Sequence, residues 1–257
     1  MKGHDILGNI AILKFDRKDK ASRKKKEAER FLKEHKGVRT ILEKTEKFHG
    51  RLRVPGTRFI AGENTKEALY KENNCLFRLN VETCYFSPRL ASERKEIAGM
   101  VKKGENVLVM FGGVAPFAIA IANLAKPAKV VSVELGKECN KYAKENVKRN
   151  KVEKIISLIQ GDVRRKIPKI KERFDRIVMP RPNLKDSFLD VAFQMIRKNG
   201  AIHYYGFYKE DKADEMKKLI INEAGRAKRK VKIARIKKAG DIGVRKFRYR
   251  ADVKVLN

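Results

Sequence analysis

The 257-residue sequence has no tryptophan, three cysteines and no long apolar run. The cysteines, Cys75, Cys84 and Cys139, are odd in number and lack CxxC spacing, so neither a disulfide framework nor a metal site is expected. No stretch approaches the roughly 18–20 apolar residues of a membrane helix. The first residues also lack the basic and then apolar order of a cleavable signal. These absences predict a cytoplasmic protein with reduced thiols and no membrane span.

Acidic residues are also scarce. The chain has 31 Asp and Glu against 63 Lys and Arg, which gives a formal charge of 63 − 31 = +32. Such a surplus repels itself unless a polyanion is the partner, and a phosphate backbone supplies sequence-independent affinity through counterion release. Nucleic acid is therefore the expected partner. A highly charged surface shaped by a hot or AT-rich source is the alternative explanation.

Hydrophobic residues, at 42%, suffice for a packed core and fall into two regions of different character. The first region, 1–80, mixes short strands with one basic amphipathic helix. Its expected elements are an apolar segment over 6–15 with a turn or bulge at Gly8-Asn9, a helix over 18–36, and strands over 38–43 and 75–81 and near Phe59-Ile60. This region is predicted to be a small α/β domain.

The second region, 81–257, alternates buried strands with helices. Strands are expected over 106–111, 129–134, 155–159, 174–179 and 201–207, helices over 90–102, 117–125, 137–150, 185–196 and 216–227, and a final strand pair over 230–237 and 246–255. This alternation is typical of a doubly wound α/β fold with a mostly parallel sheet.

Ligands of such sheets bind at the carboxyl ends of the strands. Here these ends carry a glycine turn at 111–113, Glu134, Gly161-Asp162 and the segment 179–182. An acid about 20 residues after the glycine turn suits a ribose diol, and a second acid can accept from the exocyclic amine of adenine. NAD and S-adenosylmethionine both fit. The segment GGVAP is not GxGxxG, and the chain ends in a hairpin-like strand pair, so a methyltransferase is favoured.

Three segments resemble the archaeal and eukaryotic tRNA guanine-37 N1-methyltransferase family: YFSPRLASER (85–94), MFGGVAPFAIAIA (110–122) and GAIHYYGF (200–207). DILGNIAIL (5–13) is similar to the start of the family's middle domain. The resemblance implies a Rossmann-like class I methyltransferase domain behind a small α/β domain that contacts tRNA. It also implies an enzyme that uses S-adenosylmethionine on guanosine 37, beside the anticodon. A monomer without a metal is expected. The related wyosine-pathway enzymes share the first block, and they methylate a tricyclic guanosine derivative or transfer an aminocarboxypropyl group.

The resemblance also implies a role for individual residues. Glu93 matches the family's general base, and the catalytic arginine falls on Arg53, with Arg51 and Arg58 as rivals. The implied cofactor-binding residues are Arg89, Phe111, Gly113, Glu134, Leu135, Asp162, Val163 and Pro180, and the implied substrate-binding residues are Tyr85 and Arg181. At the start of a helix, Glu93 could instead only complement the helix dipole.

The chain departs from the family at several positions. Val109 replaces an aspartate, Ala115 replaces a glycine, and Pro180 stands where the family has an asparagine, so no side-chain amide is available there. The last change favours the wyosine branch, and the first two leave open a non-catalytic RNA-binding module. No counterpart of the family's extra N-terminal domain is found, so recognition is expected to rest on the small domain and on basic surfaces. The Lys24-Lys25-Lys26 run is a candidate phosphate contact, and His203 is expected to be a core histidine.

Overall fold

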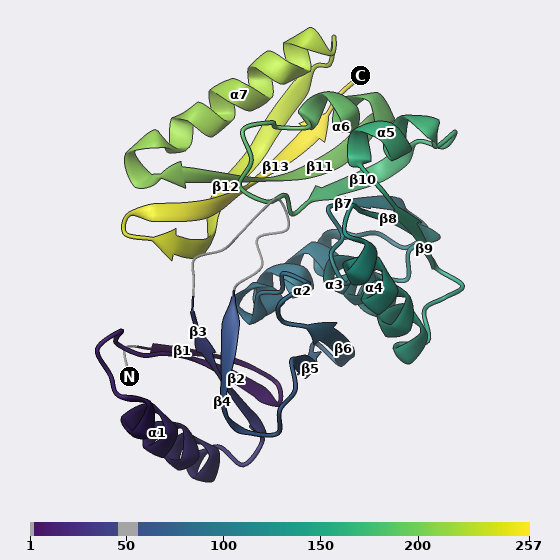
Figure 1. Ribbon diagram of the computed structural model, residues 1–257. Coiled ribbons are helices and arrows are strands. Elements are labelled where there is room, and N and C mark those ends of the chain that lie inside the picture. Colours follow the sequence, from purple (N-terminus) through teal and green to yellow (C-terminus); the bar gives the residue numbers. More distant parts are fainter. Residues whose placement is uncertain (1–2, 46–55) are drawn as a thin grey trace. The chain divides into compact units, whose positions relative to one another are not determined.

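The computed structural model describes residues 3–45 and 56–257. The chain forms two compact units, Met1–Pro88 and Arg89–Asn257 (Figure 1). Within the described residues, no helix is long and apolar enough to cross a membrane. The three cysteines are buried free thiols.

The first unit contains a four-stranded sheet, a helix and a separate hairpin. The sheet, in the order β1-β2-β3-β4, consists of β1 (Gly3–Leu7), β2 (Ile10–Lys14), β3 (Thr40–Lys44) and β4 (Thr57–Gly62). Only β2 and β3 are parallel, and α1 (Ala21–Glu34) connects them. The hairpin pairs β5 (Glu67–Glu72) with β6 (Cys75–Asn80). The buried Ala28 and Phe31 place the apolar face of α1 in the core of this unit.

Two tight turns shape this unit, and the first confirms the turn expected at Gly8-Asn9 between the apolar segments. Gly8 has φ +59°, and a Cβ there would lie 1.7 Å from the Leu69 carbonyl oxygen, so only glycine fits the turn between β1 and β2. Asn73 and Asn74 have φ 48° and 58°, which is the geometry of a tight two-residue hairpin and pairs β6 with the unpredicted β5.

The second unit is built on a seven-stranded sheet in the order β12-β13-β11-β10-β7-β8-β9. Its strands are β7 (Asn106–Met110), β8 (Lys129–Glu134), β9 (Ile156–Gln160), β10 (Phe174–Met179), β11 (Ile196–Lys209), β12 (Val231–Gly243) and β13 (Lys246–Val255). The five strands from β11 to β9 are parallel, while β13 is antiparallel to both β11 and β12. The chain runs from β7 out to β9 and returns at β10 beside β7. The switch in strand order, where such sheets bind ligands, therefore lies between β7 and β10.

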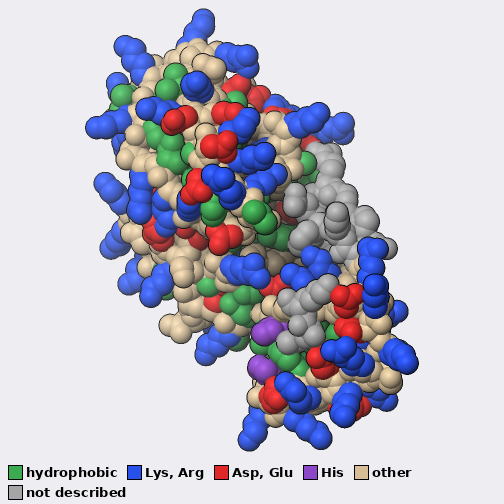
Figure 2. Space-filling model, turned by 90° about the vertical axis from the view of Figure 1, so that its left-hand side faces the viewer, with side chains coloured by type: hydrophobic (Ala, Val, Ile, Leu, Met, Phe, Trp, Pro, Cys, Tyr) green, Lys and Arg blue, Asp and Glu red, His purple; other side chains and the backbone are tan. Residues whose placement is uncertain are grey.

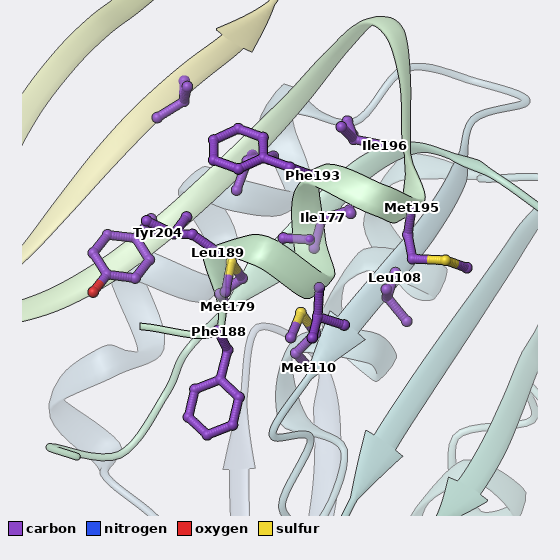
Figure 3. Packing of buried hydrophobic residues seen from close by; sticks show 14 of the residues in the cluster. Leu108, Met110, Ile177, Met179, Phe188, Leu189, Phe193, Met195, Ile196 and Tyr204 are labelled. Carbon is purple, nitrogen blue, oxygen red and sulfur yellow. The ribbon is translucent and has the colours of Figure 1, made fainter. Parts of the chain in front are cut away.

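Helices cover both faces of this sheet (Figure 1). They are α2 (Ala91–Met100), α3 (Pro116–Ala125) and α4 (Lys137–Arg149) on one face and α5 (Val163–Lys166), α6 (Leu189–Met195) and α7 (Ala213–Arg226) on the other. The largest core lies under α6 and α7, where Met110, Met179, Phe188 and Leu189 gather (Figure 3). The predicted doubly wound α/β fold and its antiparallel end are confirmed.

One predicted helix begins late. The helix expected over 185–196 starts only at Leu189, after Phe188 with φ 58°, because residues 181–188 form a loop. Two of the expected strands are also longer than predicted, since β11 extends to Lys209 and β12 to Gly243.

Candidate active site

The glycine turn after β7, residues 111–113, packs closely against the neighbouring strand β8. Gly112 donates its backbone N–H to the Val133 carbonyl at 2.9 Å, and a Cβ on Gly112 would lie 2.1 Å from Oγ of Ser132. Phe111, Gly113 and Ala115 all have positive φ, at 59°, 56° and 68°. Such a backbone exposes its amides to a ligand and leads directly into α3.

Glu134, the acid that ends β8, connects this turn to the next loop. Its side chain is 9% exposed; Oε2 accepts from Gly113 N and Oε1 from Gly136 N, each at 2.7 Å. Burial raises the pKa of Glu134, although these N–H groups oppose the shift. The Leu135 N–H also acts on this carboxylate, and because a carboxylate offers about four acceptor positions, Glu134 can still accept from a ribose diol.

The loop after β9 adds the second acid. Asp162 caps α5 by accepting from Arg164 N at 2.8 Å, and Gly161 N donates to the Glu134 carbonyl at 2.8 Å. Val163 is buried, whereas Leu135 is 37% exposed. The acids predicted to bind ribose and adenine therefore belong to directly hydrogen-bonded loops.

Asn140, in the first turns of α4, is a residue that sequence reasoning missed. It is 4% exposed; its Nδ2 lies 3.5 Å from the Glu134 carbonyl, and its Oδ1 has no hydrogen-bond partner among the described residues. A buried acceptor without a donor beside Glu134 fits a site that a polar ligand completes. The available signal was a polar side chain just after the acid-ended strand.

The loop after β10 is held from inside by Arg181. Its guanidinium is 5% exposed, donates from Nη2 to the carbonyls of Leu184 and Asp186, and lies 5.7 Å from the Tyr204 ring. Arg181 was expected to bind substrate, but its side chain is turned into its own loop because these carbonyls have no helical partner. Pro180, just before it, is half-buried.

Arg164, also missed from the sequence, holds the same loop from outside. It pairs with Asp186 and Asp190, both at 2.7 Å, and its guanidinium lies 5.0 Å from the Phe188 ring. Phe188 in turn packs edge-on against Phe111, with ring centroids 5.0 Å apart. The turns after β7, β9 and β10 are thus tied into one edge.

Glu93, the predicted general base, lies in the first turn of α2 and is 5% exposed. Oε1 accepts from Tyr205 Oη at 2.9 Å and from Arg250 Nη1, and Oε2 lies 3.3 Å from Lys237 Nζ. These partners come from the sheet, so Glu93 does more than complement the helix dipole. Arg89 is exposed at the start of the second unit.

Of the three candidate arginines, only Arg58 lies within the described residues, since Arg51 and Arg53 fall in the gap 46–55. Arg58 Nε donates to Glu43 Oε2 at 3.2 Å, and Lys24 Nζ donates to Oε1 of the same carboxylate at 2.6 Å. Arg58 and Lys24 are therefore engaged by Glu43. The run Lys24-Lys25-Lys26 was expected to contact phosphate. Lys24 is buried, so within this run only Lys25 and Lys26 are exposed and able to do so.

Tyr85, which was expected to bind the substrate base, lies near the end of the first unit and is 38% exposed. No group of three or more His, Cys, Asp or Glu residues that could hold a metal ion occurs within 3–45 and 56–257. A pocket of about 760 Å³ between α6 and α7 lies away from the strand edge; among the residues that line it are Arg173, Phe193, Arg226 and Arg229.

The sheet order and the acids at its carboxyl edge define a Rossmann-like α/β domain of the methyltransferase class. Residues 68–237 match the model of the TRM5/TYW2 methyltransferase domain, and residues 1–65 match the TYW2 N-terminal domain. The chain belongs to the TRM5/TYW2 methyltransferase family, which confirms the resemblance inferred from its motifs.

Individual relatives agree. The tRNA (guanine(37)-N(1))-methyltransferase Trm5b of Pyrococcus abyssi is 39% identical over 79% of this chain, and the match spans 59% of that protein. The tRNA (guanine(37)-N(1))/4-demethylwyosine(37)-methyltransferase Taw22 of Nanoarchaeum equitans is 33% identical over 97% of this chain and 98% of its own length. The crystal structure of the Pyrococcus abyssi Trm5b superposes with a TM-score of 0.89 at 33% identity, covering 100% of this chain and 76% of that one.

Proposed function

We propose that the protein is a tRNA methyltransferase that transfers a methyl group from S-adenosylmethionine to N1 of guanosine 37. The observation that carries the proposal is the edge at which Gly113 N and Gly161 N both donate to Glu134, with Asp162 next in the chain, in a protein of this family. The proposed enzyme acts as a cytoplasmic monomer without a metal.

The cofactor would lie across the carboxyl edge of the sheet. Glu134 accepts the ribose hydroxyls, Asp162 accepts from the adenine amine, and the orphaned Oδ1 of Asn140 is a further acceptor. Phe111, Gly113, Leu135 and Val163 line the same edge, with Arg89 and Pro180 as further proposed contacts. S-adenosylmethionine would supply the electrophilic methyl group when bound, and the residues of this chain would hold and orient the cofactor.

Proton removal is the step that the protein must provide. N1 of guanine carries a proton at neutral pH, so its lone pair is not available to attack a methyl sulfonium. In the proposed reaction the N1–H bond breaks as the N1–CH₃ bond forms, the proton passes to Glu93, and the sulfonium becomes a neutral thioether. Negative charge that builds on O6 is balanced by an arginine. The contact of Arg58 with Glu43 leaves Arg53 as the proposed residue, with Arg51 as its rival.

The proposed substrate is the anticodon loop of tRNA. The net charge of +32 supports a polyanionic partner, and Figure 2 shows Lys and Arg side chains over much of the visible surface. Tyr85 is proposed to stack on the target base, as its exposure of 38% allows.

Action on a wyosine intermediate at position 37 is the second candidate. Pro180 in place of an amide side chain, the match of 1–65 to the TYW2 N-terminal domain and the double name of the Nanoarchaeum relative favour it. Aminocarboxypropyl transfer from the same cofactor is the third outcome to be distinguished.

One experiment separates these functions. The protein is incubated with S-adenosylmethionine labelled in the methyl group and, separately, in the aminocarboxypropyl chain, with tRNA that carries unmodified guanosine 37 or the tricyclic intermediate. Mass spectrometry of the digested nucleosides is expected to show 1-methylguanosine at position 37. Label only in the tricyclic base would replace the first candidate by the second. Cofactor binding without any transfer would indicate a non-catalytic RNA-binding module.

A further inference from the structure

Two rows of polar side chains cross the antiparallel end of the large sheet. The strand register pairs Tyr205 of β11 with Arg250 of β13, and Arg250 with Lys237 of β12. Two residues further along, His203 is paired with Asp252. Because side chains alternate along a strand, residues two apart point to the same face, so both rows lie on one side of the sheet.

The first row converges on Glu93. Tyr205 Oη and Arg250 Nη1 both donate to Oε1, whereas Oε2 faces Lys237 Nζ at 3.3 Å. Lys237 is hydrogen-bonded to the neighbouring Glu96. An oxygen that accepts from a hydroxyl and a guanidinium has both lone pairs engaged, so among the described residues Oε2 is the oxygen that keeps hydrogen-bonding capacity.

The second row fixes Arg250 in place. Arg250 is fully buried; Nη2 donates to Glu96 Oε1 at 2.7 Å, and Nε lies 2.8 Å from Asp252 Oδ1. His203 Nδ1 lies 2.6 Å from Asp252 Oδ1, and its Nε2 lies 2.7 Å from Arg176 Nη1. Since a guanidinium only donates, Nε2 accepts and Nδ1–H donates to Asp252. Arg250 therefore cannot turn away from Glu93 without breaking a chain of buried contacts.

This cluster lies at the level of the proposed site. Tyr205 directly follows Tyr204, which is paired with Met179, the last residue of β10. Glu93 is thus held at the carboxyl edge, where the ligand of a doubly wound sheet binds.

Attachment of α2 to the sheet does not by itself explain so many buried charges. Desolvation of a buried ion pair offsets much of its attraction, and apolar replacements of similar volume are often as stable. The buried Ile97 and Ala98 already anchor α2 through apolar contacts. An ionic cluster, unlike apolar packing, fixes the orientation of one carboxylate.

We propose that Arg250 and Tyr205 are positioning residues, which hold Oε1 of Glu93 so that Oε2 is the oxygen that receives the N1 proton. This inference rests on the proposed function. Neither residue touches the substrate; both act through Glu93.

The test is single-turnover methyl transfer to tRNA by Tyr205→Phe, which removes one donor and keeps the ring. We expect the rate to fall roughly 10- to 100-fold, with unchanged dissociation constants for cofactor and tRNA. In a Glu93→Gln background the same substitution is expected to cause no further loss, because the carboxylate that it orients is gone. Tyr249→Phe is the matched control, since Tyr249 is a buried tyrosine in the core of the opposite face, and its rate is expected to stay at the wild-type value.

Arg250→Lys is the second variant, because a lysine keeps the charge but cannot reach three carboxylates at once. It is expected to lower the same rate at normal cofactor affinity, and melting curves report whether the fold survives. A wild-type rate for Tyr205→Phe, or an equal loss with and without Glu93, would overturn the inference while the proposed function stands. A wild-type protein that binds cofactor and transfers nothing would overturn the proposed function, and this inference with it.

Discussion

Gly113 donates its backbone N–H to Oε2 of Glu134 at 2.7 Å, which joins the turn after β7 to the end of β8. The two residues lie 21 positions apart in the sequence and meet because their strands are parallel neighbours. The backbone of the sheet therefore brings together the residues that are proposed to hold the cofactor.

Removal of the Glu134 carboxylate is expected to weaken S-adenosylmethionine binding. Glu134→Ala leaves a buried ribose hydroxyl without its acceptor, which is expected to weaken the free energy of cofactor binding by about 1–3 kcal/mol. Asp162→Ala is expected to have an effect of the same size, because it leaves the adenine amine without its acceptor. Isothermal titration calorimetry measures the effect. Glu138→Ala is the control, because Glu138 is an exposed acid paired with Lys141 on the following helix and is expected to leave affinity unchanged. Wild-type affinity in both site variants would remove the proposed cofactor site.

The role of Glu93 as a base can be measured directly. Glu93→Gln keeps the shape of the side chain but cannot take a proton, so the single-turnover rate is expected to fall by about 10²–10⁴ with near-normal binding of tRNA and cofactor. A higher pH is expected to restore part of the rate, because solvent then removes the N1 proton. An unchanged rate would mean that Glu93 only anchors α2 to the sheet.

Close packing of Gly112 against Ser132 predicts that a loss of stability at one position can be recovered by a change at the other. A Cβ on Gly112 would lie 2.1 Å from Ser132 Oγ but 3.5 Å from Ser132 Cβ. Gly112→Ala is therefore expected to destabilise the protein by about 1–3 kcal/mol, and the additional change Ser132→Ala to restore most of the loss. Chemical denaturation of the two single variants and the double variant gives the three free energies of unfolding. If the double variant is no more stable than Gly112→Ala alone, the contact with Oγ is not the cause.

The buried histidine predicts how stability depends on pH. Burial lowers the pKa of His203 and the nearby Arg176 lowers it further, while Asp252 opposes the shift. Because the pKa in the folded state lies below that in the unfolded state, the unfolded chain binds more protons as the pH falls below about 6.5, and stability decreases there. Burial raises the pKa of Asp252, but His203 and Arg250 outweigh it and bring it to about 2, so Asp252 stays charged.

His203→Gln can keep both hydrogen bonds but does not titrate. The melting temperature of the variant is therefore expected to change less between pH 7 and pH 5 than that of the wild type. Identical pH profiles would show that His203 does not control stability in this range.

The charge of the chain predicts a salt-sensitive complex. The logarithm of the association constant for tRNA is expected to fall linearly with the logarithm of the salt concentration, because each phosphate contact releases counterions. Fluorescence anisotropy at several salt concentrations measures the slope. Lys25→Ala with Lys26→Ala is expected to reduce the slope by about one to two, whereas Lys24→Ala, at a buried residue paired with Glu43, is expected to act on stability. A flat salt dependence would contradict phosphate binding.

Local pattern in the sequence determined the large sheet and the edge where its ligand binds. The runs 107–110 and 130–133 predict buried strands because every side chain in them is apolar or small. The glycine turn, Glu134 and Asp162 follow their strands directly. Parallel strands bring their carboxyl ends to one edge, so placing these residues together required only the order of the elements.

Tertiary structure alone decided what surrounds Glu93, and a local loop conformation that no periodicity specifies decided what surrounds Arg181. The two donors to Oε1 of Glu93 lie 112 and 157 residues away, on strands whose register no local pattern specifies. Arg181 turns inward because the carbonyls of its own loop lack helical partners, and the same loop delays α6 to Leu189. Sequence periodicity reports which face of an element is buried, whereas the partner of a buried charge depends on how distant strands pair.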